Sequence, residues 1–271
     1  AKEQTVQYDA NNYLNLIGGN GPSKIDGKIM GGGNIYLINP NGVIFGDNSS
    51  VNVGNLYVST RPLDQVDADA FETSGTNPLA NSAEALGDIV NLGNMCANSV
   101  YLEGDNVTLT TESVKDVTKA VVGAQGEINV CFADGEMPAT EVNNDQFKNK
   151  PDIKNITNVE WQDLAGNGRN DMTPYWQIRN VYELQNMKNN LSANYTLVRD
   201  IDAESTEMWN DGAGFQPVGT GYMEERTEYF VSPYTGRTYT EKIIELNYNN
   251  AFTGKFNGLN HRIDDLEKKT E

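Results

Sequence analysis

Hydrophobic residues in this chain occur in short runs that Gly, Asn, Pro and Asp separate. The clearest runs are residues 35–38, 43–45, 51–53 and 56–58. Their spacing is too close for helices, which need roughly ten or more residues of periodic sequence. Similar β-branched runs return at residues 88–92, 99–110 and 127–132. The pattern therefore predicts an all-β fold built from many short strands.

Strands this short cannot bury their apolar side chains within one pass of the chain. We therefore expect successive coils to stack as a parallel β-helix, a solenoid with backbone hydrogen bonds between coils. Alternating residues should then face inward and form continuous columns. The expected core residues are Ile29, Ile35, Leu37, Ile44, Val51, Val53, Leu56, Val58, Ile89, Val100, Leu102, Val107, Leu109, Ile128 and Val130.

The turn Asn39-Pro40-Asn41-Gly42 has residue types that a sharp corner requires. Pro40 sets φ at the first central position, Asn41 tolerates the second, and Gly42 can adopt positive φ. The amides of Asn39 and Asn41 can hydrogen-bond neighbouring backbone, or stack as ladders where successive coils place Asn at one corner.

The second half of the chain has a different distribution of apolar residues. Residues 135–154 hold few large apolar side chains, which predicts a connector, and we place a boundary near residue 145. The expected sections are 1–145 and 146–271. Asn180 and Glu183 have the spacing of a capping box before an apolar stripe, so we expect one short helix at residues 180–191. Residues 63–71 form either a short helix or an excursion from the coil.

A tyrosine-rich segment at residues 229–244 predicts an inserted, protruding β-hairpin around the turn 233–236. Tyr229, Tyr234 and Tyr239 are candidate ligand-binding residues, because exposed tyrosines can contact sugar or protein surfaces. Most hairpin tyrosines instead pack across strands. Both interpretations stay open at this point.

Residues 14–60 hold a group of motifs that includes Gly31-Gly32-Gly33, Asn39-Pro40-Asn41-Gly42 and the run 53–60, Val-Gly-Asn-Leu-Tyr-Val-Ser-Thr. Together with Pro22-Ser23-Lys24-Ile25-Asp26-Gly27-Lys28-Ile29, they resemble the secretion domain of filamentous-haemagglutinin-type exoproteins. The resemblance implies a large surface adhesin of a Gram-negative bacterium, folded as a right-handed parallel β-helix. It also implies export to the cell surface by a dedicated outer-membrane transporter in two-partner secretion. In that family the Asn-Pro-Asn-Gly region belongs to the part that the transporter recognises.

A second resemblance covers residues 175–266. The succession of residues 195–202, 215–219 and 252–263 is similar to the GLUG-type repeat of bacterial surface proteins, with the tyrosine-rich segment inserted. That repeat is a stalk or coil-building module. The resemblance therefore implies that the second section continues the architecture of the first.

Charge excludes some function classes. The chain has 38 acidic and 20 basic residues and a formal net charge of −18, which repels phosphate backbones and anionic lipid. We therefore expect no nucleic-acid partner. Without a run of about 18 apolar residues, we also expect no membrane insertion. No signal-peptide pattern opens the sequence, and we expect a mature form or an excised fragment.

Few residues suggest chemistry. Asp200 and Asp202 share one face of a strand and can act as an acid and a base or hold a cation. They can instead stabilise a turn, which is the interpretation we favour. His261 is the only histidine and lacks a nucleophile signature nearby. Cys96 and Cys131 are either two small buried residues or a disulfide. We expect no catalytic residues, no metal and no cofactor.

The leading hypothesis is a non-enzymatic segment of a secreted, cell-surface adhesin. Its partners would be the outer-membrane transporter and a host or bacterial surface glycan or protein. The alternative is a β-helical polysaccharide hydrolase or lyase that uses Asp200 and Asp202, because that fold often presents acidic residues in a groove.

Overall fold

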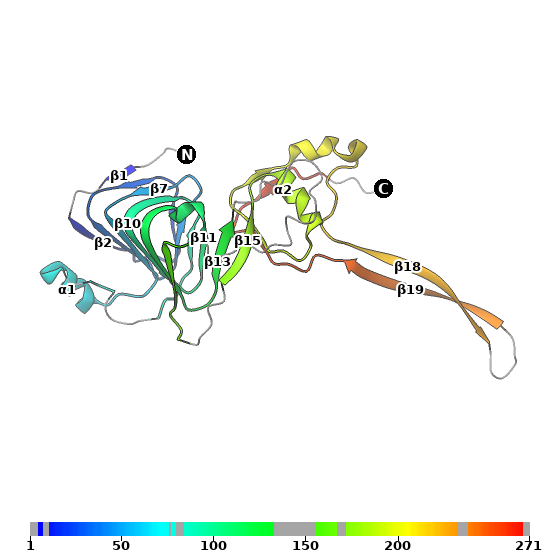
Figure 1. Ribbon diagram of the computed structural model, residues 1–271, viewed down its shortest axis with the longest axis horizontal. Coiled ribbons are helices and arrows are strands. Elements are labelled where there is room, and N and C mark those ends of the chain that lie inside the picture. The colour runs from blue at the N-terminus through cyan, green and yellow to red at the C-terminus, as the bar shows by residue number, and fades with distance from the viewer. Residues whose placement is uncertain are drawn as a thin grey trace. The chain divides into compact units, whose positions relative to one another are not determined.

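The computed structural model in Figure 1 describes residues 5–7, 11–75, 77–79, 84–132, 156–166, 172–231 and 238–267. Contacts divide the chain into two compact units. Among the described residues, those up to Gln177 belong to the first unit and those from Ile178 belong to the second. The predicted boundary near residue 145 lies outside the described residues and stays a prediction.

The first unit is a stack of short parallel strands. Their bounds are β1 (Thr5–Gln7), β2 (Asn12–Leu16), β3 (Ser23–Ile25), β4 (Lys28–Met30), β5 (Asn34–Ile38), β6 (Val43–Phe45), β7 (Ser50–Asn52), β8 (Asn55–Ser59), β9 (Ile89–Asn91), β10 (Asn94–Gly104), β11 (Val107–Thr110), β12 (Asp116–Ala124), β13 (Ile128–Phe132), β14 (Val159–Asp163) and β15 (Met172–Ile178).

Strand pairing follows the coil, because each strand pairs with its equivalent in the next coil. One row runs β1-β4-β7-β10, a second runs β2-β5-β8-β10-β12-β14, and a third runs β3-β6-β9-β11-β13-β15. The long strand β10 serves two rows, since its first residues pair with β7 and its later residues with β8. The predicted parallel β-helix is confirmed.

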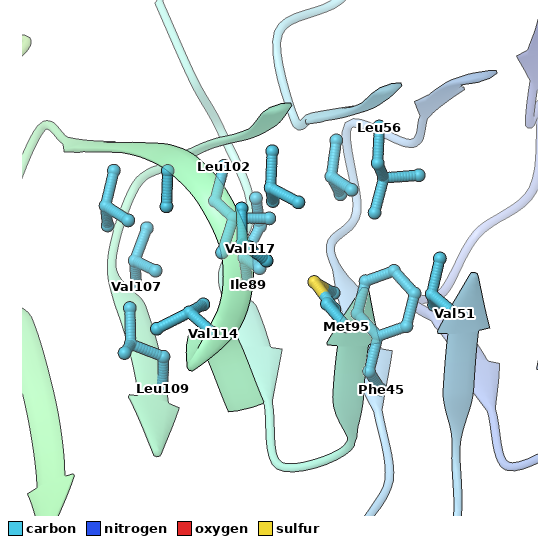
Figure 2. Packing of buried hydrophobic residues seen from close by; sticks show 14 of the residues in the cluster. Phe45, Val51, Leu56, Ile89, Met95, Leu102, Val107, Leu109, Val114 and Val117 are labelled. Atoms are coloured by element: carbon cyan, nitrogen blue, oxygen red, sulfur yellow. The ribbon is translucent and has the colours of Figure 1, made fainter. Parts of the chain in front are cut away.

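Register explains the interior. Ile35 pairs with Leu56, and Leu56 with Val100, so one column of apolar side chains crosses three coils. Figure 2 shows such side chains packed between the rows, with Phe45 and Met95 beside Val51. Because no single coil could bury these residues, stacking itself creates the core.

All the expected core residues are buried except Ile44. Val43 and Phe45 are fully buried in its place. The corner before β6 sets which residues of the strand face the interior. The Val43 amide donates to the Asp88 carbonyl at 3.0 Å, and inward and outward side chains alternate from Val43 onward. The prediction for Ile44 was therefore wrong by one residue.

Helix α1 (Gln65–Ser74) forms the excursion between β8 and β9. Asp64 caps its start, since Asp64 Oδ1 accepts from the Asp67 amide at 2.9 Å. Gly75 ends it with φ of 66°. The two interpretations of residues 63–71 therefore describe the same element. A short 3-10 helix, η1 (Glu112–Val114), lies between β11 and β12.

The second unit also contains parallel strand pairs. Strand β16 (Tyr195–Leu197) pairs with β20 (Phe256–Asn257), and β17 (Ile201–Asp202) pairs with β21 (Ile263–Asp264). Its helices are α2 (Val181–Asn186), η4 (Met187–Asn189), η5 (Glu204–Met208) and η6 (Asn210–Gly212). The predicted helix at 180–191 is confirmed as α2 with η4, and Asn180 caps it by accepting from the Glu183 amide at 2.9 Å.

The antiparallel strands of the predicted hairpin are confirmed, while the predicted turn at 233–236 lies outside the described residues. Strands β18 (Thr220–Val231) and β19 (Thr238–Asn250) pair antiparallel along their length and form the two-stranded ribbon labelled in Figure 1. The hairpin is inserted between the parallel strands of the second unit, since β16 and β17 precede it and β20 and β21 follow it.

Candidate functional site

The Asn39-Pro40-Asn41-Gly42 turn is a corner between β5 and β6. The Gly42 amide donates to the Asn39 carbonyl at 3.0 Å, which closes the turn. Asn39 also folds back on it, because Asn39 Oδ1 accepts from the Asn41 amide at 3.0 Å. Gly42 has a φ of 109°, a region that side chains disfavour. The sharp corner expected from the sequence is therefore present.

Asn39 joins this corner to the preceding coil from a fully buried position. Its Nδ2 donates to Ser23 Oγ at 2.9 Å and to the Gly21 carbonyl at 3.2 Å. Its backbone amide donates to the Ser59 carbonyl of the following coil at 3.1 Å. The buried Asn39 amide thus finds its own partners in the Gly21-to-Ser23 segment, and removing them would leave a buried polar group unsatisfied.

Asn41 is different, because it is exposed. Its Nδ2 donates to the Gly19 carbonyl at 2.6 Å and lies 3.3 Å from Asn39 Oδ1. Asn41 therefore braces the corner from outside and leaves part of its amide at the surface. The two asparagines of the motif have unequal roles, one internal and one external.

The following coil packs directly on the corner. A Cβ on Gly42 would lie 2.8 Å from the Asp88 carbonyl oxygen, and one on Gly87 would lie 2.5 Å from the Gly42 nitrogen. Thr60 Oγ1 donates to the Gly87 carbonyl at 2.9 Å. No sequence pattern marks Gly87 and Asp88 as part of this site, because the α1 excursion separates them from the motif.

Asparagines do form a ladder, but at a different place from the corner. Asn34 Nδ2 donates to Asn12 Oδ1 at 2.6 Å, and Asn55 Nδ2 donates to Asn34 Oδ1 at 2.6 Å. These residues are in register at the starts of β2, β5 and β8. Asn39 instead binds Ser23 and Gly21, so the ladder possibility for the motif itself is not realised.

A tyrosine stack runs along the same strands. Tyr36 and Tyr57 have ring centroids 4.4 Å apart, and Tyr57 and Tyr101 have centroids 4.7 Å apart with nearly parallel planes. Phe71 of α1 meets Tyr36 edge-on at 5.3 Å. Burial and the neighbouring tyrosines raise the pKa of Tyr36 to about 12. The stack attaches the excursion helix to the coils.

An ion pair lies after the motif run. Arg61 Nε lies 3.1 Å from Glu103 Oε2, and both side chains are largely buried. Burial raises the pKa of Glu103, while Arg61 and Ser59 act in the opposite direction. The pair links the start of the excursion to β10.

The hairpin tyrosines are only partly described. Tyr229 is 74% exposed, Tyr234 lies outside the described residues, and the backbone of Tyr239 belongs to β19. Register pairs Tyr229 with Thr240 and Phe230 with Tyr239. Tyr229 and Tyr239 are therefore not cross-strand partners.

Asp200 holds the neighbouring coil segment. Its Oδ1 accepts from the Arg262 amide at 3.0 Å and lies 3.2 Å from His261 Nδ1. These contacts, the Arg262 amide first, hold the pKa of Asp200 below its ordinary value. A carboxylate with a lowered pKa is a poor proton donor, so this geometry fits a structural role.

Asp202 also binds backbone. Its Oδ1 accepts from the Glu204 amide at 3.0 Å, as in an Asx turn. The contacts of both aspartates therefore favour the turn-stabilising interpretation. Among the described residues, no group of three or more His, Cys, Asp or Glu side chains is arranged to hold a metal ion.

The cysteines are both free thiols in this structure, so no disulfide links them. Cys131 is buried, as expected for a small inward residue, and burial raises the pKa of its thiol. Cys96 is exposed, contrary to the expectation of two buried residues, because its position in β10 faces outward between the buried Met95 and Ala97.

In the parts of the chain that the structure describes, no helix has the length and apolar character needed to cross a membrane.

Comparison with known proteins gives a family match. The TPS secretion domain family model matches residues 3–198. Heme/hemopexin-binding protein of Haemophilus influenzae is 35% identical over 107 residues, which cover 37% of this chain and 12% of that protein. Halomucin of Haloquadratum walsbyi is 34% identical over 109 residues, which cover 39% of this chain and 1% of that protein.

The matched region is thus a small part of each of these long relatives. No solved structure gives a significant match to the chain.

Proposed function

Because this chain belongs to the TPS secretion domain family, whose members are secreted exoproteins of the two-partner pathway, we propose that it directs export of a surface adhesin. Its partner in export is a cognate outer-membrane transporter. The match spans residues 3–198 and includes the whole Asn39-to-Gly42 corner.

The observation that carries this proposal is the corner itself. Its residues link three coils, through Asn39 to Ser23, through the Asn39 amide to Ser59, and through Gly42 to Asp88. We propose that folding of this corner completes the first coils, and that export depends on the folded corner.

Attachment is the second part of the proposal. The exported segment acts at the cell surface as part of a filamentous-haemagglutinin-like adhesin that binds a host or bacterial glycan or protein. The hairpin β18–β19 supports this role, since it presents Tyr229 at 74% exposure. Tyr234 and Tyr239 belong to the same proposed contact surface.

We also propose that the second unit is a GLUG-type, coil-building module. Its parallel pairs, β16 with β20 and β17 with β21, support this assignment. No catalytic role is proposed for Asp200 or Asp202, because their carboxylates bind His261 and backbone amides.

Export is tested by expressing the full parent protein in Gram-negative cells with and without its transporter. We expect the protein in the medium or on the cell surface only when the transporter is present. Removal of residues 34–60 should abolish export, while removal of residues 221–249 should leave it intact. Equal export without the transporter contradicts the proposal.

Attachment is tested with beads that carry the purified segment. Tyr229→Ala should reduce binding of the beads to target cells, while Val66→Ala, an equally exposed apolar change on α1, should not. Unchanged binding after removal of the whole hairpin would assign attachment to another part of the protein.

A further inference from the structure

The second unit has an aromatic pair, a half-buried Trp209 and an exposed Tyr182, that the proposed function does not use. Tyr182 on α2 and Trp209 between η5 and η6 have ring centroids 5.1 Å apart, with planes inclined by 34°. Tyr182 remains 51% exposed although it contacts an indole. Met208, the residue before Trp209, is 80% exposed. These three residues form what we call the Trp209 platform.

The backbone of Trp209 is held firmly. Its carbonyl accepts from the Gly212 amide at 3.0 Å and from the Gly214 amide at 2.9 Å, while its own amide donates to the Thr206 carbonyl at 3.0 Å. Thr206 is fully buried. The platform is therefore fixed before any partner arrives, which lowers the entropy cost of binding.

The next two residues have left-handed backbone. Asn210 and Asp211 have φ of 53° and 57°, a conformation that Asn and Asp adopt more readily than other residues with side chains. Side chains hold the loop in this shape, since Asn210 Nδ2 donates to the Gly214 carbonyl at 2.6 Å and Gln216 Nε2 donates to Asn210 Oδ1 at 3.3 Å.

Helix α2 is tied to the same loop. The Gln216 amide donates to Gln185 Oε1 at 2.8 Å, and Gln185 Nε2 returns a hydrogen bond to the Gln216 carbonyl at 2.9 Å. Lys188 Nζ donates to Gln216 Oε1 at 2.8 Å. The position of Tyr182 relative to Trp209 is therefore set by a hydrogen-bond network as well as by the ring contact.

Charge indicates the kind of partner. Glu204, Glu207 and Asp211 lie on the same segment as Met208 and Trp209, and all three are exposed. The nearby basic side chains are already engaged, Lys188 by Gln216 and Arg179 by Glu183 at 2.8 Å. A half-buried Trp beside an exposed Tyr in an acidic setting favours a guanidinium, which stacks on indole and pairs with carboxylates.

We propose that the Trp209 platform is a docking site for an arginine-bearing surface of a partner protein. Trp, Tyr and Met are residue types enriched at protein interfaces. The net charge of −18 also favours a basic partner over an anionic one. This site extends the attachment role proposed above and gives it a partner chemistry, but its test does not depend on export.

The probe is a ten-residue peptide of alternating Arg and Gly, with a matched Lys-Gly peptide as the charge control. Binding to the purified chain is measured by calorimetry and by the NMR shift of the Trp209 indole N–H. We expect the Arg peptide to bind more tightly than the Lys peptide. Trp209→Ala should lower the affinity for the Arg peptide by about tenfold, which is the contribution expected of a well-formed cation–π contact.

Other variants separate stacking from charge and from folding. Tyr182→Ala should weaken binding, and Trp209→Phe should give an intermediate loss, so either tests the site if Trp209→Ala fails to fold. Neutralising Glu207 and Asp211 together (E207Q with D211N) should reduce affinity and its salt dependence. Neutralising Glu72 and Glu84 together in the first unit should change neither the affinity nor its salt dependence.

Several outcomes overturn the proposal. One is that the Arg peptide does not bind, and another is that the Trp209→Ala variant binds it with the same affinity as the unmutated chain. A third is that neutralising Glu72 and Glu84 reduces the affinity as much as neutralising Glu207 and Asp211 does. If a neutral oligosaccharide such as cellohexaose binds through Trp209 and the Arg peptide does not, the platform is a glycan site. Failure of export or of cell attachment, by contrast, leaves this result unaffected.

Discussion

The phenol rings of Tyr36 and Tyr57 stack at a centroid distance of 4.4 Å with planes only 8° apart. The cause is register, because β5 and β8 pair residue for residue and place Tyr36 opposite Tyr57. Tyr101 of β10 extends the same column. One substitution in the middle therefore removes two ring contacts at once.

We predict that Tyr57→Ala lowers the stability of the first unit by about 2–4 kcal/mol, from lost burial and two aromatic contacts. Tyr57→Phe keeps both rings and should lose much less. Thermal unfolding followed by circular dichroism measures the difference. A midpoint for Tyr57→Ala equal to that of Tyr57→Phe would show that the stack does not stabilise the coils.

Gly42→Ala should also be destabilising, for two reasons. It places a side chain at φ of 109° and brings Cβ to 2.8 Å from the Asp88 carbonyl oxygen. We expect a loss of about 2–3 kcal/mol. Gly75→Ala is the matched control, because Gly75 also has positive φ but a Cβ there meets nothing within 4 Å. If both variants lose the same stability, close packing at the corner is not important.

The lowered pKa of Asp200 predicts a pH effect with a definite sign. A carboxylate whose pKa is lowered in the folded state stabilises the fold at pH values above its ordinary pKa, which is near 3.8. This stabilisation is lost as the pH falls through the lowered pKa. The stability difference between the wild type and Asp200→Asn should therefore be constant near neutral pH and shrink in acid. A difference that grows as the pH falls would contradict this account.

Asp200→Asn and Asp202→Asn also test the enzymatic alternative. Because both carboxylates have backbone partners, we expect no turnover of plant, host or bacterial glycans by the wild-type chain. The assay is a screen for released reducing sugar. Turnover by the wild type that either substitution abolishes would establish a hydrolase or lyase.

Local signals allowed much of the fold to be predicted from sequence. Pro40 and Gly42 fix a corner by their own backbone preferences, and Asn180 with Glu183 fixes a helix start. Alternation identified inward columns such as Ile35 with Leu56. Alternation failed at Ile44, because in a continuous apolar run it does not show which residues face inward. A non-local hydrogen bond from the Val43 amide to the Asp88 carbonyl decides this.

The sites were less predictable, because their contacts join distant segments. Neither Gly87 beside Gly42 nor Gly21 beside Asn39 carries a sequence signal of its role. Trp209 and Tyr182 meet although 27 positions separate them in the chain, and the hydrogen bonds between Gln216 and Gln185 join the same two segments. Residue type indicates what a position can do, while the topology of the coil decides which residues meet.

The two asparagines of the corner test the central claim, that Asn39 supports folding and that export depends on the folded corner. Asn39→Ala removes a buried amide and leaves Gly21 and Ser23 groups without this partner, so we expect a loss of about 2 kcal/mol. Asn41 is exposed, and Asn41→Ala should cost about 0.5 kcal/mol.

The most direct measurement is paired, with thermal midpoint on the purified segment and secretion on the full parent protein with its transporter. The account predicts that Asn39→Ala lowers both the midpoint and secretion, and that secretion falls in proportion to lost stability across Asn39→Ala, Asn41→Ala and Gly42→Ala. If Asn39→Ala abolishes secretion while the segment melts at the unmutated temperature, the folding account is contradicted and direct recognition by the transporter replaces it.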